Sequence, residues 1–69
     1  MDDLNFAQNI TMLRRRHGIT QETLADFIGV TKASVSKWET GQSLPDIQTL
    51  LLLATYYDVT LDELLGYHP

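Results

Sequence analysis

The five basic side chains of this 69-residue chain gather in one part of the sequence. Lysine and arginine bind phosphate through charge and hydrogen bonds. The net charge of −4 argues against a nucleic-acid partner, but the distribution of charge indicates that one end of the molecule attracts anions. Residues 11–43 contain three acidic residues and all five basic residues, whereas the rest of the chain contains six acidic residues and no basic residue. The basic residues are Arg14, Arg15, Arg16, Lys32 and Lys37.

Other reactive side chains are scarce or isolated. There is no cysteine, so the chain has no disulfide framework, thiolate nucleophile or thiolate metal ligand. His17 and His68 stand alone, and no serine, histidine and aspartate occur at an informative spacing, so we expect no metal, no cofactor and no enzyme activity. The apolar run 50–54 is too short to cross a bilayer, and the acidic start MDDLNF does not look like a signal peptide, so we expect a cytoplasmic protein.

Three threonines indicate where helices begin. An N-cap threonine accepts a hydrogen bond from the backbone near the helix start, and apolar residues on either side of the cap pack together. Thr20, Thr31 and Thr60 each fit this pattern, and Glu63 adds the acidic partner of a capping box to Thr60. The apolar pairs are Ile19 with Leu24, Val30 with Val35, and Val59 with Leu64.

The apolar spacing predicts five helices, at about residues 3–17, 21–28, 32–40, 46–57 and 61–65. Glycine follows each of the first three helices, and Pro45 with Asp46 opens the fourth. Because no segment alternates apolar and polar residues, we expect one all-α domain over residues 1–69. The residues predicted to face inward include Phe6, Ile10 and Leu13 in the first helix, Leu24, Ala25, Phe27 and Ile28 in the second, and Ile47, Leu50, Leu51, Leu53, Ala54 and Tyr57 in the fourth.

The third helix has a small, polar and basic face. A helical wheel places Val35 and Trp38 on the opposite side, with Ser34. Such a face fits the DNA major groove, which is about 12 Å wide, although any surface helix has a polar face. The residues of this face, which lie within about 140° of arc at about 100° per residue, are Lys32, Ala33, Ser36, Lys37 and Thr40.

Four segments in this order resemble the Cro and phage-repressor type of helix-turn-helix domain, an Xre-like family. They are LRRRHGITQETLA, GVTKASVSKWETG, PDIQTLLLLA and VTLDELLG, and the resemblance runs from about Ile10 to Gly66. It implies a compact five-helix, lambda-repressor-like fold with the helix-turn-helix at helices two and three, its core at about residues 20–41. It also implies double-stranded DNA as the partner, with helix three in the major groove.

Specific roles follow from the resemblance, position by position. It implies that Lys32, Ala33, Ser36 and Lys37 approach base edges, where lysine donates to guanine O6 and N7 and alanine packs against a thymine methyl. The positions that match the family's phosphate contacts are Thr20, Gln21, Thr31, Thr40, Gln42 and Ser43.

Arg14 and Glu39 match a family pair that bridges helix one and the end of helix three. The alternative is two solvated charges that contribute less than about 1 kcal/mol. Arg15, Arg16 and His17 occupy the last turn of helix one, where cations interact favourably with the helix dipole, so we interpret them as helix-end stabilisers rather than DNA contacts.

Leu52 departs from the family's pattern, which often has a polar or basic residue at this position. It falls opposite the predicted inward stripe, and Tyr56 follows one turn later, so this pair predicts a protein contact. The family's dimer contacts usually lie around helix five, so Leu61 and Leu65 are either core or interface.

Together these features predict a sequence-specific DNA-binding transcription regulator, with repression the family's commoner outcome. It would bind an inverted repeat as a homodimer, with recognition helices about 34 Å apart. Two alternatives use the same fold: an antitoxin that binds its toxin through Leu52 and Tyr56, and a protein-interaction module without DNA affinity. The short segment after Gly66 indicates either a small stand-alone regulator or part of a longer protein with a C-terminal region.

Overall fold

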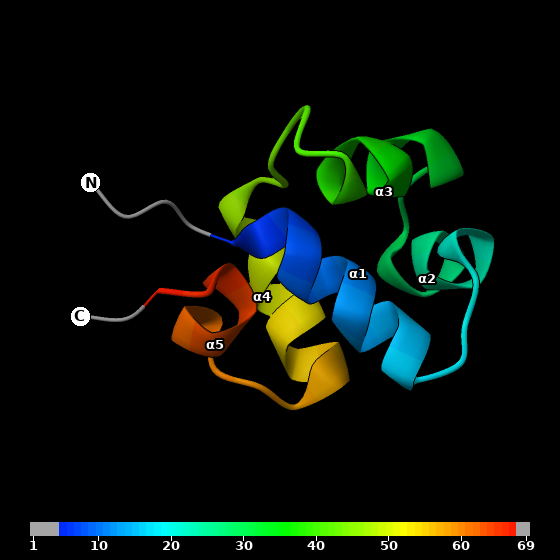
Figure 1. Cartoon of the computed structure of the whole chain (residues 1–69). Coiled ribbons are helices and arrows are strands. Elements are labelled where there is room, and N and C mark those ends of the chain that lie inside the picture. The colour runs from blue at the N-terminus through cyan, green and yellow to red at the C-terminus, as the bar shows by residue number, and fades with distance from the viewer. Residues whose placement is uncertain (1–4, 68–69) are drawn as a thin grey trace.

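The computed structural model describes residues 5–67, which form five helices and no strand. Within this range α5 packs against α1 and α4, and α3 packs against α1 and α2 (Figure 1). The predicted all-α fold is therefore confirmed, and residues 3–4 of the first predicted helix and His68 lie outside the described range. The helices are α1 (Phe6–Arg16), α2 (Gln21–Ile28), α3 (Lys32–Glu39), α4 (Ile47–Tyr57) and α5 (Leu61–Leu65).

A single hydrophobic core joins all five helices. Each helix contributes one fully buried aliphatic side chain, and each such side chain stabilises the fold by about 1.5–3 kcal/mol. Because no helix buries its apolar face without the others, the position of α3 depends on the whole core. The five residues are Ile10, Leu24, Val35, Leu53 and Leu64.

Side-chain caps fix the starts of four helices. Thr20 Oγ1 accepts a hydrogen bond from Thr23 N at 3.0 Å, and Thr31 Oγ1 accepts one from Ser34 N at 3.1 Å. Thr60 and Glu63 form the complete capping box. The three predicted threonine caps are confirmed. In α4, Asp46 Oδ1 accepts from Thr49 N at 2.9 Å.

The turn between α2 and α3 is short and left-handed. Gly29 has φ +85°, a conformation that L side chains rarely adopt, and its N–H donates to Ala25 O. Thr31 then caps α3, so only three residues separate the two helices. This geometry fixes α3 relative to α2 and completes the helix-turn-helix.

Three residues predicted to face inward are exposed instead. Phe27 is 67% exposed, and its ring lies against Tyr56 at a centroid distance of 5.2 Å. Ile47 is 59% exposed and Leu51 is 52% exposed. Apolar residues occupy most sides of α4, so their periodicity does not identify the buried side of the helix. In the structure Leu53 is the leucine of α4 that is fully buried in the core.

Candidate nucleic-acid interface

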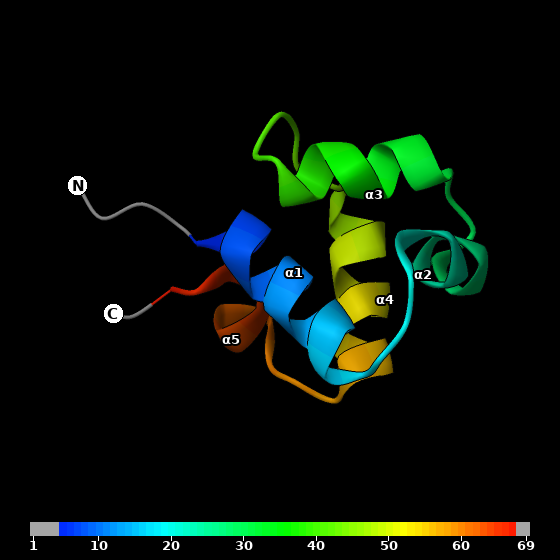
Figure 2. The same ribbon diagram turned by 45° about the vertical axis from the view of Figure 1, so that its right-hand side comes forward.

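α3 presents one open face along an edge of the molecule (Figure 2). Val35 and Trp38 anchor its opposite side in the core, as predicted. Ser34 is half-buried, and its hydroxyl lies 3.0 Å from Thr31 Oγ1 as part of the cap. The side chains of the open face are the exposed Lys32, Ala33, Lys37 and Thr40 and the half-buried Ser36.

The start of α2 borders a hollow of about 430 Å³ that also reaches α1 and α3. Lys32 and Arg14 bring positive charge to it, and Glu22 brings a negative charge. The N-terminus of a helix presents unpaired backbone N–H groups and a partial positive charge, which favour an anion. The full lining is Arg14, Gly18, Ile19, Thr20, Gln21, Glu22 and Lys32.

The threonines at the two helix starts use their hydroxyls within the protein. Thr20 Oγ1 accepts the capping hydrogen bond and donates to Thr23 Oγ1 at 3.0 Å. Thr31 Oγ1 accepts from Ser34 N and pairs with the Ser34 hydroxyl. Their predicted phosphate contacts stay predictions, and the backbone N–H groups at these helix starts are donors that a phosphate could use in place of the threonine hydroxyls.

A second polar group lies just after α3. Thr40 Oγ1 donates to Ser36 O at 3.0 Å, and Gln42 Nε2 donates to Thr40 Oγ1 at 2.9 Å. The backbone N–H groups of Gln42 and Ser43 both point at Lys37 O. Gln42 and Ser43 are exposed, so the three predicted phosphate-contact residues of this segment lie together beside the open face of α3.

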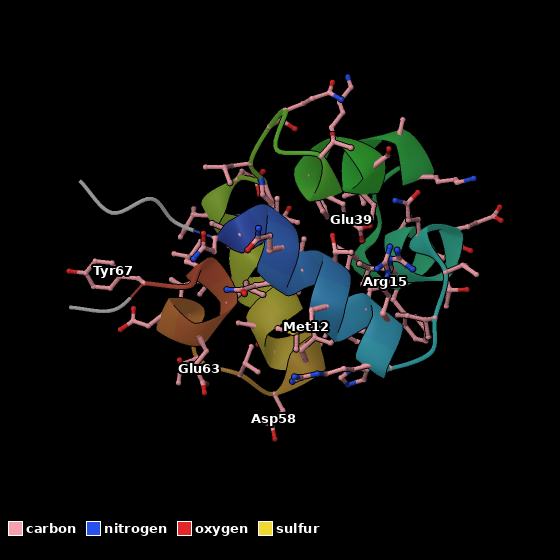
Figure 3. All side chains as sticks on the ribbon, viewed as in Figure 1. Met12, Arg15, Glu39, Asp58, Glu63 and Tyr67 are labelled. Carbon is pink, nitrogen blue, oxygen red and sulfur yellow. The ribbon has the colours of Figure 1, made fainter. Side chains whose placement is uncertain are left out.

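Arg14 and Glu39 form the ion pair that the sequence predicts. Arg14 Nε lies 2.7 Å from Glu39 Oε2, and Arg14 Nη2 lies 3.0 Å from Glu39 Oε1. Figure 3 shows Glu39 on the side of α3 that faces α1. Arg14 Nη1 also donates to Ile19 O at 2.9 Å. The pair therefore ties α1 to the end of α3 and to the loop before α2.

A third partner in this cluster was not predicted. Gln21 Nε2 donates to Glu39 Oε1 at 3.0 Å. Burial raises the pKa of Glu39, but hydrogen bonds from Arg14 and Gln21 outweigh it, so that pKa lies below its usual value. The hydrogen bond to Glu39 in turn raises the pKa of Arg14. No local sequence signal pointed to this contact, since Gln21 and Glu39 lie in different helices.

The predicted protein-contact residues differ in how exposed they are. Leu52 is 52% exposed, as expected, but Tyr56 is partly buried and lies between the rings of Phe27 and Tyr57. Leu61 and Leu65 are partly buried against the core. Three other apolar side chains in the segment before Leu52 are exposed, namely Leu44, Ile47 and Leu51.

Asp58 and Glu63 lie at the end remote from α3 in Figure 3. His17 Nδ1 lies 2.9 Å from Leu13 O, and its ring meets Tyr57 edge-on at 4.8 Å, so this histidine packs at the end of α1.

Within residues 5–67 no group of His, Cys, Asp and Glu side chains could hold a metal ion. No helix in the described part of the chain is long and apolar enough to span a membrane.

Comparisons with known proteins agree with this geometry. The chain is 36% identical over 63 residues to the HTH-type transcriptional activator BcrR of Enterococcus faecalis, covering 91% of this chain and 31% of that protein. A transcriptional regulator from Listeria innocua superposes with a TM-score of 0.95 at 34% identity, over 99% of this chain and 64% of that one. The P22 c2 repressor, solved with a synthetic operator, gives a TM-score of 0.85 at 27% identity, over 91% and 96% of the two chains.

The chain thus spans about a third of BcrR and less than two thirds of the Listeria regulator. The helix-turn-helix family pattern itself matches residues 10–64, which include all of α2, α3 and α4. That match covers most of the chain, and it contains the two capped helices and the glycine turn described above. This chain belongs to the helix-turn-helix family.

Proposed function

We propose that this chain is a sequence-specific DNA-binding domain of a transcription regulator, with α3 in the major groove. The main support for this proposal is the open face of α3, which consists of small, polar and basic side chains. The opposite side of the helix is buried in the core, which holds α3 in place. A groove about 12 Å wide admits such a helix. The P22 c2 repressor, which has the same fold, was solved with an operator.

The proposed contacts divide into base readers and backbone contacts. Lys32, Ala33, Ser36 and Lys37 are the base readers, because they form one face of α3. Backbone contacts come from the start of α2, the start of α3 and the segment after α3, where N–H groups and short polar side chains gather. The residues assigned to the backbone are Thr20, Gln21, Thr31, Thr40, Gln42 and Ser43.

We propose that two copies bind an inverted repeat. One chain carries five bases, and a protein that neutralises only a few phosphates binds weakly at cellular salt, since the slope is about −0.9 per contact. α4 has no charged residue, and its exposed Ile47, Leu51 and Leu52 suit contact with a second copy. The regulator would act by occupying its site in the cytoplasm rather than by catalysis, and repression follows where that site overlaps a promoter.

The test is selection of bound duplexes from a randomised pool, followed by fluorescence anisotropy at about 50 and 200 mM salt, a range over which phosphate contacts are strongly weakened. We expect an enriched inverted repeat with half-sites about one helical turn apart. The charge-reversal variant Lys32→Glu/Lys37→Glu should lose binding. Its matched control, Arg15→Glu/Arg16→Glu, has the same net charge and should keep site preference. Failure to enrich any sequence contradicts the proposal and favours a protein-interaction module.

A further inference from the structure

Three helices meet at the carboxylate of Glu39. Its Oε2 accepts from Arg14 Nε of α1, and its Oε1 accepts from both Arg14 Nη2 of α1 and Gln21 Nε2 of α2. The Glu39 side chain is only 5% exposed, so water competes little for these acceptors. The bidentate arginine pair is a geometrically demanding contact, and it holds the carboxylate in one orientation.

The fixed carboxylate determines which way the Gln21 amide faces. An amide presents a donor at Nε2 and an acceptor at Oε1, and only the donor is attracted to a carboxylate oxygen. The end of the side chain that meets Glu39 must therefore be Nε2. Among the hydrogen bonds of residues 5–67, Gln21 makes this side-chain contact alone, so the second hydrogen on Nε2 is still available.

The same glutamine borders the hollow at the start of α2. Lys32 and Arg14 also line this hollow, and the N-terminus of α2 opens into it. A donor held at this place adds to the positive end of the helix and to the lysine charge. A phosphate in the hollow would therefore meet a donor whose orientation is set before binding, which lowers the entropy lost on association.

We propose that Glu39 is a positioning residue for DNA binding, which holds the Gln21 amide so that its free N–H is directed to a backbone phosphate. This inference rests on the proposed function. Glu39 itself is an anion and touches no phosphate, and it acts through Gln21. The role differs from that of the ion pair with Arg14, which would stabilise the fold whether or not DNA is present.

A double-mutant cycle tests the coupling. Gln21→Met keeps the length of the side chain and removes the donor, so affinity for the selected duplex should fall about tenfold, the effect of one hydrogen bond to a charged group. The salt dependence should not change, because glutamine is neutral. In the Glu39→Met background, which leaves the Gln21 amide no side-chain acceptor at this position, the same substitution should cost less than about threefold, since the amide is no longer positioned. Gln8→Met, an exposed glutamine on α1, is the control and should have no effect.

A second measurement does not depend on a variant. In the wild-type complex with DNA, the scalar coupling across the hydrogen bond from Gln21 Nε2 to the Glu39 carboxylate should persist. The resonance of the other amide proton should shift when DNA is added. The inference is overturned if DNA binding abolishes the coupling, or if Gln21→Met costs the same factor in both backgrounds. If the wild-type chain selects no duplex at all, it is the proposed function that fails.

Discussion

At the scale of single residues, Glu39 accepts hydrogen bonds from two other helices and therefore decides how the site is assembled. The pairing of Arg14 with Glu39 could be anticipated because both positions match a family pattern. The contact with Gln21 could not, because the sequence marks Gln21 only as a polar residue at a helix start that matches a phosphate-contact position. The packing of the core determines which side chains meet across three helices, and local sequence patterns do not predict these contacts.

The low pKa of Glu39 predicts a pH-dependent stability. In the folded state this carboxyl binds a proton less readily than in the unfolded chain, where its pKa has the ordinary glutamate value of about 4.5. Between those two pKa values the unfolded state binds more protons, so the free energy of unfolding rises with pH. The contribution of Glu39 is therefore complete above the unfolded pKa and is lost as the pH falls through the folded pKa.

Glu39→Gln should lower the free energy of unfolding at pH 7 by about 1–3 kcal/mol, because it leaves Arg14 without its charged acceptor. The difference from the wild-type protein should narrow as the pH falls from about 5 to 3, toward and below the usual glutamate pKa. Urea unfolding followed by the fluorescence of the buried Trp38 measures both quantities. A difference that stays constant over this pH range would contradict the assignment.

Lys37 tests base reading at the same scale. It is exposed on the open face of α3, so Lys37→Ala should relax the base preference at one position of each half-site, at a cost of about 1–3 kcal/mol per contact. Arg16→Ala removes the same charge from the end of α1 and should leave the preferred sequence unchanged. Repeating the pool selection with both variants gives the comparison. If the two selected sites are identical, Lys37 does not read bases.

At the scale of the helices, starts were easier to predict than buried faces. A threonine cap is a local chemical requirement, and all three predicted caps are present. The buried side of α4 is not a local property, because leucine fills four consecutive positions from Leu50 to Leu53 and suits every direction. Contacts with α2 and α5 decide the orientation of this helix, and they bury Leu53 while leaving Leu51 and Leu52 exposed.

α5 ends at Gly66, which has a left-handed backbone conformation and lies close to Asn5 and Asn9. Gly66 has φ +72°, and a Cβ there would lie 2.7 Å from Asn9 Nδ2 and 3.1 Å from Asn5 Cβ. Gly29 has φ +85°, but a Cβ there would meet nothing within 4 Å. Gly29→Ala should therefore cost about 1 kcal/mol through backbone strain alone.

Gly66→Ala should cost clearly more than Gly29→Ala. The added methyl group would displace Asn9, whose Nδ2 donates to Glu63 O at 3.3 Å and so helps to hold α5 against α1. Thermal unfolding of the two variants, with the wild-type protein as reference, measures the difference. If both variants were destabilised equally, α5 would be able to move away from α1 with no loss of stability, and the close contact at Gly66 would not contribute to the free energy of unfolding.

At the scale of the whole molecule, charge and size both suit a pair of copies on DNA. The bases lie in residues 11–43, and Asp58 and Glu63 lie at the end remote from α3 (Figure 3). The described part of the chain measures 32 × 24 × 22 Å. These dimensions are comparable with one turn of DNA, about 34 Å, which is the spacing of the half-sites in the proposed inverted repeat.

The exposed apolar side of α4 should mediate this pairing. Leu52→Lys adds a charge to a helix that has none and places it where a second copy would have to desolvate it, so self-association should weaken at least tenfold, a cost of about 1.4 kcal/mol or more. Leu51→Lys should act in the same way, because Leu51 is equally exposed.

Sedimentation equilibrium, with and without the selected duplex, measures the association. Gln8→Lys adds the same charge to an exposed position of α1 and is the control. Because both leucines are half-exposed in the single chain, their thermal unfolding at low protein concentration should change little, which separates lost pairing from lost folding. If both leucine variants associate as the control does, the pair must form through another surface, and the partly buried Leu61 and Leu65 of α5 would be the next residues to test.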